Sequence, residues 1–515
     1  MAALSGVLAL FFAFWIFCVR LFAPLEGDGF FKRLGKLGFL GALWVGLEYL
    51  RSFLFTGFPW LLLGHSQWRR PAVIQIAEFG GAYIVSFMLI FFNLALASYI
   101  FRMFAWHRAR IRSGAPLSKF ARITPEFYLA AIFVMASLYM YILNMPSVKN
   151  ARVEFRVGMV QTDFAGILNW DAASGMKNLE TLRALTLPLK NARVDAVLWS
   201  ESSTPPMWPI IGTPQIKSWA EELSAEVSAP IIMGNGAYIP PKDGSPAKKH
   251  NIAAFVSETS GLSGEFYAKR HLVPFGEYIP SWCEGLVKTI VPIGSLTRGD
   301  SAVCFDVKIK NKIRKISPVI CYEDVFPNLV RDAVLTGAEY IFVCTNDSWY
   351  GREGGAWQHA AHSALQAVSF RRPVLRASVN GLSGVFDQYG RMTPSFTLKN
   401  KDGGIFDGTG EAAAVLDVFD GFMQPLDSET GKRKLGSPLC GENGSIYARC
   451  SGYADVVSYL NFEGKTTFYA KHGDVFARAC YYVSIAALLL VFARKFISPR
   501  ISKPENSRAA CVVKE

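Results

Sequence analysis

The 515-residue chain lacks the motifs that mark several large classes of protein. It has neither a GxGxxG fingerprint nor a P-loop, so no nucleotide site is indicated. Its histidines and cysteines do not stand at metal-ligand spacings, and we predict no metal and no cofactor. It has no basic stripe interleaved with aromatic residues, so we expect no nucleic-acid partner despite a formal charge of +13. No repeat of fixed period is present.

The chain is rich in apolar residues: 51% of its residues are hydrophobic, including 39 Phe and 12 Trp. Soluble enzymes of this size rarely reach such a composition, so we expect a protein embedded in the bilayer. The expected membrane spans are residues 4–23, 37–55, 72–100, 127–143 and 475–491. The first has no basic region before it and no small-residue cleavage site, which favours an anchor over a removed signal peptide.

The second expected span carries two ionisable residues, Glu48 and Arg51. Charged groups inside a span are expensive, so we expect them to face other helices or to pair with each other at their i, i+3 spacing. The alternative is that Arg51 lies at the membrane interface.

Basic residues between the spans indicate the orientation. They cluster between spans one and two, between spans three and four, and after span five: Lys32, Arg33, Lys36; Arg102, Arg108, Arg110, Arg112, Lys119, Arg122; Arg494, Lys495, Arg500, Lys503, Arg508, Lys514. The positive-inside rule places these segments in the cytoplasm and residues 147–474 on the outer face. Arg69 and Arg70, in the expected outer loop 56–71, run against this pattern.

The resulting division has four parts. Residues 1–146 are N-terminal transmembrane helices, 147–474 an extracytoplasmic domain with an insert near 421–460, 475–493 a C-terminal transmembrane helix, and 494–515 a basic tail. Within the domain, apolar periodicity predicts strands at 153–160, 196–199 and 230–233 and helices at 174–189 and 215–227. This alternation indicates an α/β fold.

One cysteine stands where a nucleophile is expected. The apolar run 316–320 reads as the end of a buried strand, and Cys321 follows it in the stretch PVICYEDVFP, before a helix-starting pattern. A strand-to-helix elbow exposes a thiol beside backbone N–H groups. A buried structural cysteine is the alternative, because free cysteines are usually buried.

Two other stretches place charged groups at strand ends. The first, DAVLWSESS, carries Glu201, and the second, YAKRHLVPFGEYIP, carries Lys269 and Glu277. Glu, Lys and Cys in this order resemble the nitrilase superfamily. KRHLVPFGEY, CYE and TNDSWYG resemble its membrane-bound branch, the apolipoprotein N-acyltransferases. The matching blocks spread over residues 157–386.

This resemblance implies a nitrilase-like αββα sandwich on an α-helical transmembrane bundle. It implies Cys321 as nucleophile, Glu201 as general base, and Lys269 with the Tyr322 N–H as oxyanion donors. Further residues follow from the same family pattern: Glu277 and Glu323 as supporting carboxylates, Trp170 at substrate entry, and Gln161 on the family strand. Structural roles for the two carboxylates and a core position for Trp170 remain open.

The resemblance also implies the reaction. A phospholipid would donate an acyl chain to Cys321, and the amine of a diacylglyceryl-modified apolipoprotein would accept it. We expect a monomer in the bacterial inner membrane with its catalytic domain on the periplasmic side. Two alternatives are a membrane-tethered amidase and a non-catalytic lipid-binding scaffold. The chain departs from the family in having fewer expected spans before the domain and Trp-Ser-Glu in place of Trp-Pro-Glu.

Two further expectations concern the domain's periphery. Residues 280–298 are apolar and glycine-punctuated, and they read either as a flap beside the nucleophile that admits an acyl chain or as ordinary core. Cys440 and Cys450 lie in the insert, in a compartment that permits disulfides, so they are a candidate pair.

Overall fold

The computed structural model describes residues 2–25, 28–113, 124–144, 151–164, 171–241, 246–280, 296–402, 404–409, 411–413, 437–441, 444–459, 462 and 464–496. The chain forms two compact units. The helical unit comprises Met1–Leu54, Ser86–Ile132 and Val475–Glu515. The α/β unit comprises Phe55–Val85 and Phe133–Asp474.

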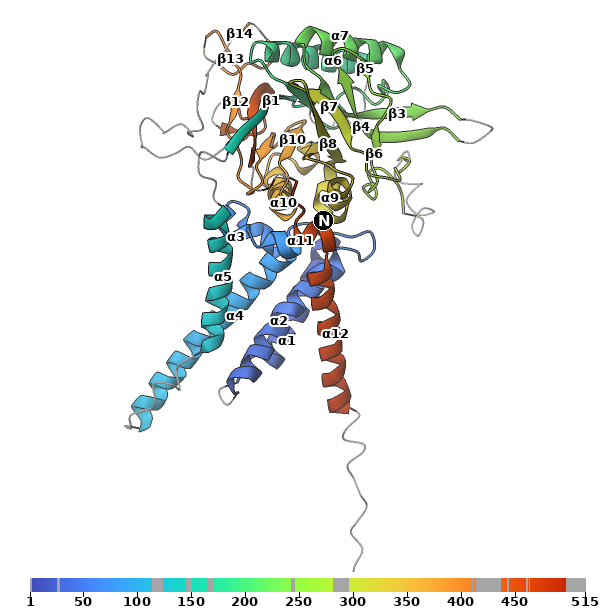
Figure 1. Ribbon diagram of the computed structural model, residues 1–515. Coiled ribbons are helices and arrows are strands. Elements are labelled where there is room, and N and C mark those ends of the chain that lie inside the picture. Colours follow the sequence, from blue (N-terminus) through green and yellow to red (C-terminus); the bar gives the residue numbers. More distant parts are fainter. Residues whose placement is uncertain are drawn as a thin grey trace, which may run out of the picture. The chain divides into compact units, whose positions relative to one another are not determined.

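The first sheet of the α/β unit has eight strands in the order β12-β15-β1-β2-β3-β4-β5, with β6 paired to β4 (Figure 1). Its centre, β1-β2-β3, is parallel, and β15 and β4 run antiparallel to it. The strands are β1 (Ala151–Gln161), β2 (Ala196–Trp199), β3 (Ile231–Ile239), β4 (Lys248–Ser257), β5 (Gly261–Leu262), β6 (Tyr267–Ala268), β12 (Ser395–Thr397) and β15 (Cys450–Tyr459).

The second sheet has five strands in the order β11-β10-β9-β8-β7, of which β8, β9 and β10 are parallel. They are β7 (Phe305–Ile309), β8 (Lys312–Ile320), β9 (Tyr340–Thr345), β10 (Val374–Ser378) and β11 (Gly384–Phe386). A separate small ladder pairs β13 (Lys399–Asn400) with β14 (Ala412–Ala413).

Helices cover the outer face of each sheet, which makes four layers (Figure 1). The first sheet carries α6 (Ala172–Thr186), its 3-10 extension η4 (Leu187–Lys190) and α7 (Pro214–Val227). The second carries α9 (Pro327–Leu335) and α10 (Gly355–Phe370). One hydrophobic core lies between the sheets and one lies under each helical layer. The expected αββα sandwich is therefore present.

Alternation along the strands produces these cores. In β2, Leu198 packs into the core between the sheets, whereas Val197 and Trp199 pack under α6 and α7. In β9, Phe342 faces the inner core and Val343 the layer of α9 and α10. A strand buried on both faces reads as a continuous apolar run. Such runs are visible in the sequence, and the expected strands of this region therefore lie close to the observed ones.

The remaining segments of the α/β unit come from the chain before α4 and from turns. They are η1 (Leu63–Gln67), α3 (Pro71–Ile74), η6 (Cys321–Val325), η7 (Asp347–Tyr350) and α11 (Phe468–His472). The expected third span is interrupted near its start, because α4 (Ala77–Ser113) leaves helical geometry at Gly80 and Gly81. Gly81 has φ +63°, and a Cβ there would lie 2.6 Å from the Tyr469 ring. Glycine therefore permits both the bend and the close approach.

A buried arginine fastens the start of α4 within the α/β unit. The guanidinium of Arg371 donates to the Glu78 carboxylate (2.7 Å) and to the Gln75 side-chain oxygen (2.7 Å). It also donates to the carbonyl of Gln388 at 2.9 Å. These bonds satisfy most of its donors, as a fully buried guanidinium requires.

The helical unit contains α1 (Ala2–Phe22), α2 (Phe30–Arg51), α12 (Val475–Phe496) and parts of α4 and α5 (Pro125–Asn144). Among the described residues, four helices are long and apolar enough to cross a membrane: Leu4–Phe22, Ala77–Arg112, Pro125–Asn144 and Val475–Ala493. The second expected span does form a helix, α2, but it is not among these four. Its charged residues explain the difference: Lys32, Arg33, Lys36, Glu48 and Arg51.

One of the basic residues used to predict orientation has another role. Arg33 is buried and forms a two-pronged ion pair with Glu126 of α5, with distances of 2.6 and 3.2 Å. Glu126 is fully buried as well. Ionisable groups in such a helical environment persist when they are paired. Glu48 is also buried, as expected for a residue facing other helices, and accepts a hydrogen bond from the Trp44 indole at 3.0 Å.

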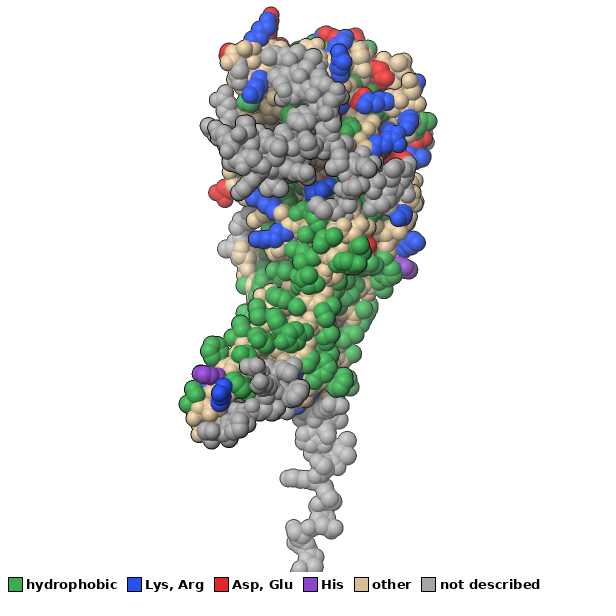
Figure 2. Space-filling model, turned by 60° about the vertical axis from the view of Figure 1, so that its left-hand side comes forward, with side chains coloured by type: hydrophobic (Ala, Val, Ile, Leu, Met, Phe, Trp, Pro, Cys, Tyr) green, Lys and Arg blue, Asp and Glu red, His purple; other side chains and the backbone are tan. Residues whose placement is uncertain are grey.

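Apolar side chains cover the spanning helices (Figure 2). Exposed examples occur on three of them, namely Leu10, Ile132 and Leu489. Inside the unit, α12 approaches α2 closely at Gly46, where a Cβ would meet the Tyr481 backbone at 3.1 Å. Small residues at helix contacts are typical of membrane bundles.

The expected disulfide is absent. Cys440 and Cys450 both carry free thiols, and Cys450 is buried on β15. Residues 281–295, which hold Cys283 and most of the expected apolar flap, and much of the 421–460 insert lie outside the described residues.

Candidate active site

Cys321 lies at the turn from β8 into η6, as the sequence predicts. Its side chain belongs to the core between the sheets and is only 7% exposed. Its backbone adopts φ +51°, in the left-handed region. A non-glycine residue there costs about 1–3 kcal/mol and persists only where its surroundings enforce it. Such strain is concentrated at functional sites, which strengthens the interpretation as a nucleophile.

The end of the neighbouring strand β9 lies near the thiol. The Thr345 side chain and the Asn346 N–H both act on the Cys321 sulfur, and the Thr345 hydroxyl donates to Asp347 Oδ1 at 3.0 Å. Burial and the charge of Glu201 raise the pKa of the Cys321 thiol to about 12. The charge of Lys269 and the interactions with Thr345 and Asn346 act in the opposite direction and lower it. The resting thiol is therefore neutral at physiological pH, and it becomes a thiolate only when a base removes the proton.

This raised pKa has a measurable consequence. We expect the rate of Cys321 alkylation by iodoacetamide to increase about tenfold per pH unit from pH 8 to 10, because only the thiolate reacts. Free cysteine should level off in that range. Peptide-resolved mass spectrometry of Cys321 measures the rate. A plateau near pH 8 would mean that the sulfur is ionised at rest.

Lys269 joins two carboxylates in a buried cluster. Its ammonium lies 3.3 Å from Glu201 Oε1 and 2.9 Å from Glu277 Oε1. The Asn251 amide donates to the same two oxygens, at 2.8 and 3.0 Å. Burial alone would lower the pKa of Lys269, but the charges of Glu201 and Glu277 outweigh it and raise that pKa well above the ordinary value. Lys269 is therefore a permanent cation.

The cluster is assembled from the ends of two strands and the interior of a third. Glu201 follows β2, Lys269 follows β6, and Asn251 lies on β4, which pairs with β6. The Lys269 N–H donates to the Asn251 carbonyl at 2.8 Å. The charges of Glu201 and Lys269 both act on the Cys321 thiol. The structure thus pairs Glu201 with Lys269, in a cluster whose charges reach the Cys321 thiol.

Glu323 holds the turn that carries Cys321. Its buried carboxylate accepts from the Ile320 N–H (2.8 Å) and the Tyr267 hydroxyl (2.7 Å). It also accepts from the N–H groups of Arg270 (2.6 Å) and His271 (2.9 Å). Burial raises the pKa of Glu323, although the hydrogen bonds from Ile320, His271 and Tyr267 act to lower it. The residue ties the end of β8 to the segment that carries Lys269.

Glu277 likewise supports the segment after Lys269. Its second oxygen accepts from the Val273 N–H at 2.8 Å, so one carboxylate binds both the ammonium and the loop.

Gln161, at the end of β1, has a structural role. Its amide donates to the carbonyls of Ile446 and Ala448 and accepts from the Ser383 hydroxyl. Trp170 lies outside the described residues.

The Tyr322 side chain points into an aromatic cluster. Its ring stacks with Trp60 at 6.4 Å and meets Phe326 edge-on at 5.2 Å. Its hydroxyl donates to the Gly57 carbonyl at 3.3 Å. The side chain therefore packs the 55–85 segment against the site, and any chemical role falls to the Tyr322 backbone.

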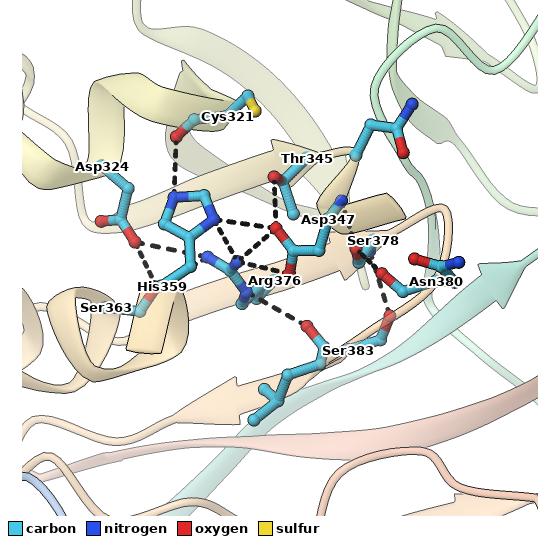
Figure 3. Close-up of polar contacts among 12 residues, drawn as sticks. Cys321, Asp324, Thr345, Asp347, His359, Ser363, Arg376, Ser378, Asn380 and Ser383 are labelled. Carbon is cyan, nitrogen blue, oxygen red and sulfur yellow. Dashed lines mark hydrogen bonds and ion pairs between the residues drawn. The ribbon is translucent and has the colours of Figure 1, made fainter. Parts of the chain in front are cut away.

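A second buried network was not predicted from the sequence (Figure 3). His359 Nε2 lies 3.1 Å from the Cys321 carbonyl, and its Nδ1 lies 2.8 Å from Asp347 Oδ1. Arg376 donates to Asp347 at 2.9 Å and pairs with Asp324 at 3.4 Å. The polar run after β9, TNDSWYG, is visible in the sequence as a motif, but the residues that it contacts are distant in sequence. Among those residues, only the polar ones within the apolar helix 355–370 stand out in the sequence.

Comparisons with known proteins agree over most of the chain. Residues 1–95 match the family model described as Apolipoprotein N-acyltransferase N-terminal domain, and residues 156–458 match the one described as Carbon-nitrogen hydrolase. A Geobacter metallireducens protein named apolipoprotein N-acyltransferase is 30% identical over 96% of this chain and 81% of its own length. A Brucella melitensis protein of the same name is 31% identical over 77% and 70%.

Among solved structures, a mutant of a Nesterenkonia amidase from the nitrilase superfamily is similar to this chain with a TM-score of 0.34 and 15% identity. The match covers 47% of this chain and 85% of that chain.

Proposed function

The chain belongs to the apolipoprotein N-acyltransferase family, and from this premise we propose how it acts in lipoprotein maturation. It takes a fatty acyl chain from a phospholipid, holds it as a thioester on Cys321, and passes it to the N-terminal amine of a diacylglyceryl-cysteine. The observation that carries this proposal is the buried ammonium of Lys269, which lies between Glu201 and Glu277 and whose charge acts on the Cys321 thiol.

In the first half-reaction the Cys321 sulfur attacks the ester carbonyl while Glu201 removes the thiol proton. The new C–S bond leaves negative charge on the carbonyl oxygen, which Lys269 and the Tyr322 N–H stabilise. The ester C–O bond then breaks, and the protonated Glu201 returns the proton to the departing lysophospholipid. Glu277 holds Lys269 in place throughout.

In the second half-reaction the acceptor amine attacks the thioester. The new C–N bond forms as Glu201 takes a proton from the amine, and the same oxyanion donors stabilise the intermediate. The C–S bond breaks, and the Cys321 thiolate recovers its proton from Glu201. The products are an amide-linked lipoprotein and the resting thiol, so no external reductant or oxidant is needed.

The topology proposed with this function places the α/β unit on the periplasmic side of the bacterial inner membrane. The support is the distribution of basic residues, of which Arg102, Arg108, Arg110 and Arg112 all fall on one stretch of α4. The membrane supplies the phospholipid, and the lipid anchors of the acceptor lie in the same bilayer.

The proposal is tested with purified full-length protein in detergent and a diacyl phospholipid. We expect a mass gain of one acyl chain on the Cys321 peptide, released by hydroxylamine as a thioester. A diacylglyceryl-cysteine peptide added afterwards should take up the chain. No mass gain at Cys321 would contradict the proposal.

An amidase activity is the second candidate, favoured by the match of residues 156–458 to the carbon-nitrogen hydrolase model. The two functions differ in the acceptor. Release of free acid from short amides, with no transfer to the lipopeptide, would support the amidase and reject the transferase.

A further inference from the structure

The His359 ring is a donor to the backbone of the candidate nucleophile. A carbonyl oxygen can only accept a hydrogen bond, so the contact of 3.1 Å between His359 Nε2 and the Cys321 oxygen requires a proton on Nε2. This holds whether or not Nδ1 also carries a proton. His359 is fully buried on α10, where water cannot replace this contact.

The other side of the ring is held by charges. Asp347 Oδ1 lies 2.8 Å from Nδ1, and Arg376 Nη2 lies 2.9 Å from the same nitrogen. Arg376 also binds the second Asp347 oxygen at 2.9 Å and pairs with Asp324. All four side chains are fully buried. The ring therefore has one orientation, with Nε2 directed at the Cys321 carbonyl.

The peptide between Cys321 and Tyr322 transmits this orientation. A trans peptide is planar, so its C=O and N–H groups point in opposite directions. A hydrogen bond that fixes the Cys321 carbonyl consequently fixes the direction of the Tyr322 N–H. It also polarises the peptide, because hydrogen bonds in series strengthen one another.

We propose that His359 is a positioning residue that aims the Tyr322 N–H at the oxyanion formed when the Cys321 sulfur is acylated. Asp347 and Arg376 orient the ring for this task. The inference rests on the part of the proposed function in which the Cys321 sulfur is acylated, because attack of that sulfur on a carbonyl forms the oxyanion. A purely structural role would be different: His359 would maintain the left-handed turn, and its loss would displace the sulfur itself.

Two reactions of the same sulfur separate these roles. Acylation by p-nitrophenyl octanoate develops an oxyanion, whereas alkylation by iodoacetamide does not. The matched variants are His359→Asn and His359→Gln in the full-length protein. The glutamine amide nitrogen can reach the position of Nε2 and donate to the carbonyl. The shorter asparagine reaches only the position of Nδ1.

For His359→Asn we expect the rate constant of acylation at saturating ester to fall about 10²–10³-fold, the range for loss of one oxyanion donor. KM and the alkylation rate should stay within about threefold. His359→Gln should retain acylation within about tenfold. Equal losses of acylation and alkylation in His359→Asn would overturn the proposal in favour of a structural role, and so would unchanged acylation.

Melting temperatures report whether each variant folds. If His359→Asn does not fold, His359→Gln decides the matter: acylation and alkylation that both stay within tenfold of wild type support the proposal, and a loss of acylation beyond tenfold, selective or shared with alkylation, contradicts it. The failures of the two proposals are distinguishable. Wild-type protein that takes octanoyl from the ester but never an acyl chain from phospholipid contradicts the proposed function and leaves the ratio test intact.

Discussion

In the Cys321→Ala variant we expect no covalently bound acyl chain and a loss of transfer of about 10⁴-fold or more, because the atom that carries the chain is gone. Thin-layer detection of acylated lipopeptide, together with intact-protein mass spectrometry, measures both effects. The fold should persist. Alanine tolerates the φ of +51° about as well as cysteine does, and the thiol is one small side chain in a large core.

Cys344 provides a matched control for this prediction. Its thiol is fully buried in the same core between the sheets, at the end of β9 beside β8. We expect Cys344→Ala to lose some stability to the cavity but to keep transfer within about threefold. Full transfer by Cys321→Ala would exclude Cys321 as the nucleophile. Loss of the acyl-enzyme only in Cys344→Ala would move that role to the neighbouring strand.

The second large effect is expected for Lys269→Met. Removal of its ammonium leaves the buried Glu201 and the partly buried Glu277 as like charges without their cation, and breaking a buried ion pair costs about 3–5 kcal/mol. It also removes an oxyanion donor, so acylation of Cys321 should fall about 10³-fold. Chemical denaturation measures the first effect, and single-turnover acylation measures the second.

The double variant Lys269→Met/Glu277→Gln separates these two effects. It restores the net charge of the cluster, and we expect it to recover most of the lost stability. It should not recover acylation, because the ammonium is still missing. Substantial acylation by either variant would show that the cation is dispensable. Equal instability of the single and double variants would mean that charge repulsion is not the cause.

Local patterns were sufficient for several features. The stretch around Cys321 predicted a strand-to-helix turn because the apolar run and the helix-starting residues are adjacent in the chain. Glu201 and Lys269 were recognised as strand-end residues by the same reasoning and by the resemblance of their motifs. Long apolar runs predicted spans at 4–23, 72–100, 127–143 and 475–491. The helices Leu4–Phe22, Ala77–Arg112, Pro125–Asn144 and Val475–Ala493 overlap these spans.

Where charges interrupt such a run, the local pattern was less informative. The helix α2 was expected, but Arg33 was interpreted as a loop cation, whereas it is buried against Glu126 from a helix 93 residues away. The expected pairing of Cys440 with Cys450 rests on their common position in the insert and on a compartment that permits disulfides, but both thiols are free. In each case the missing information is which distant segment lies opposite the residue.

The sequence by itself determined the α/β character of the domain and the membrane character of the long apolar runs, because these depend on neighbours along the chain. The resemblance of its motifs pointed to the three side chains expected to carry the chemistry. Only the tertiary structure decided what holds them. The groups that act on the thiol lie at the end of β9, and the residues that fix the Cys321 carbonyl are His359, Asp347 and Arg376. Burial without water forces each of these polar groups to find a partner, and folding alone chooses which partner is within reach.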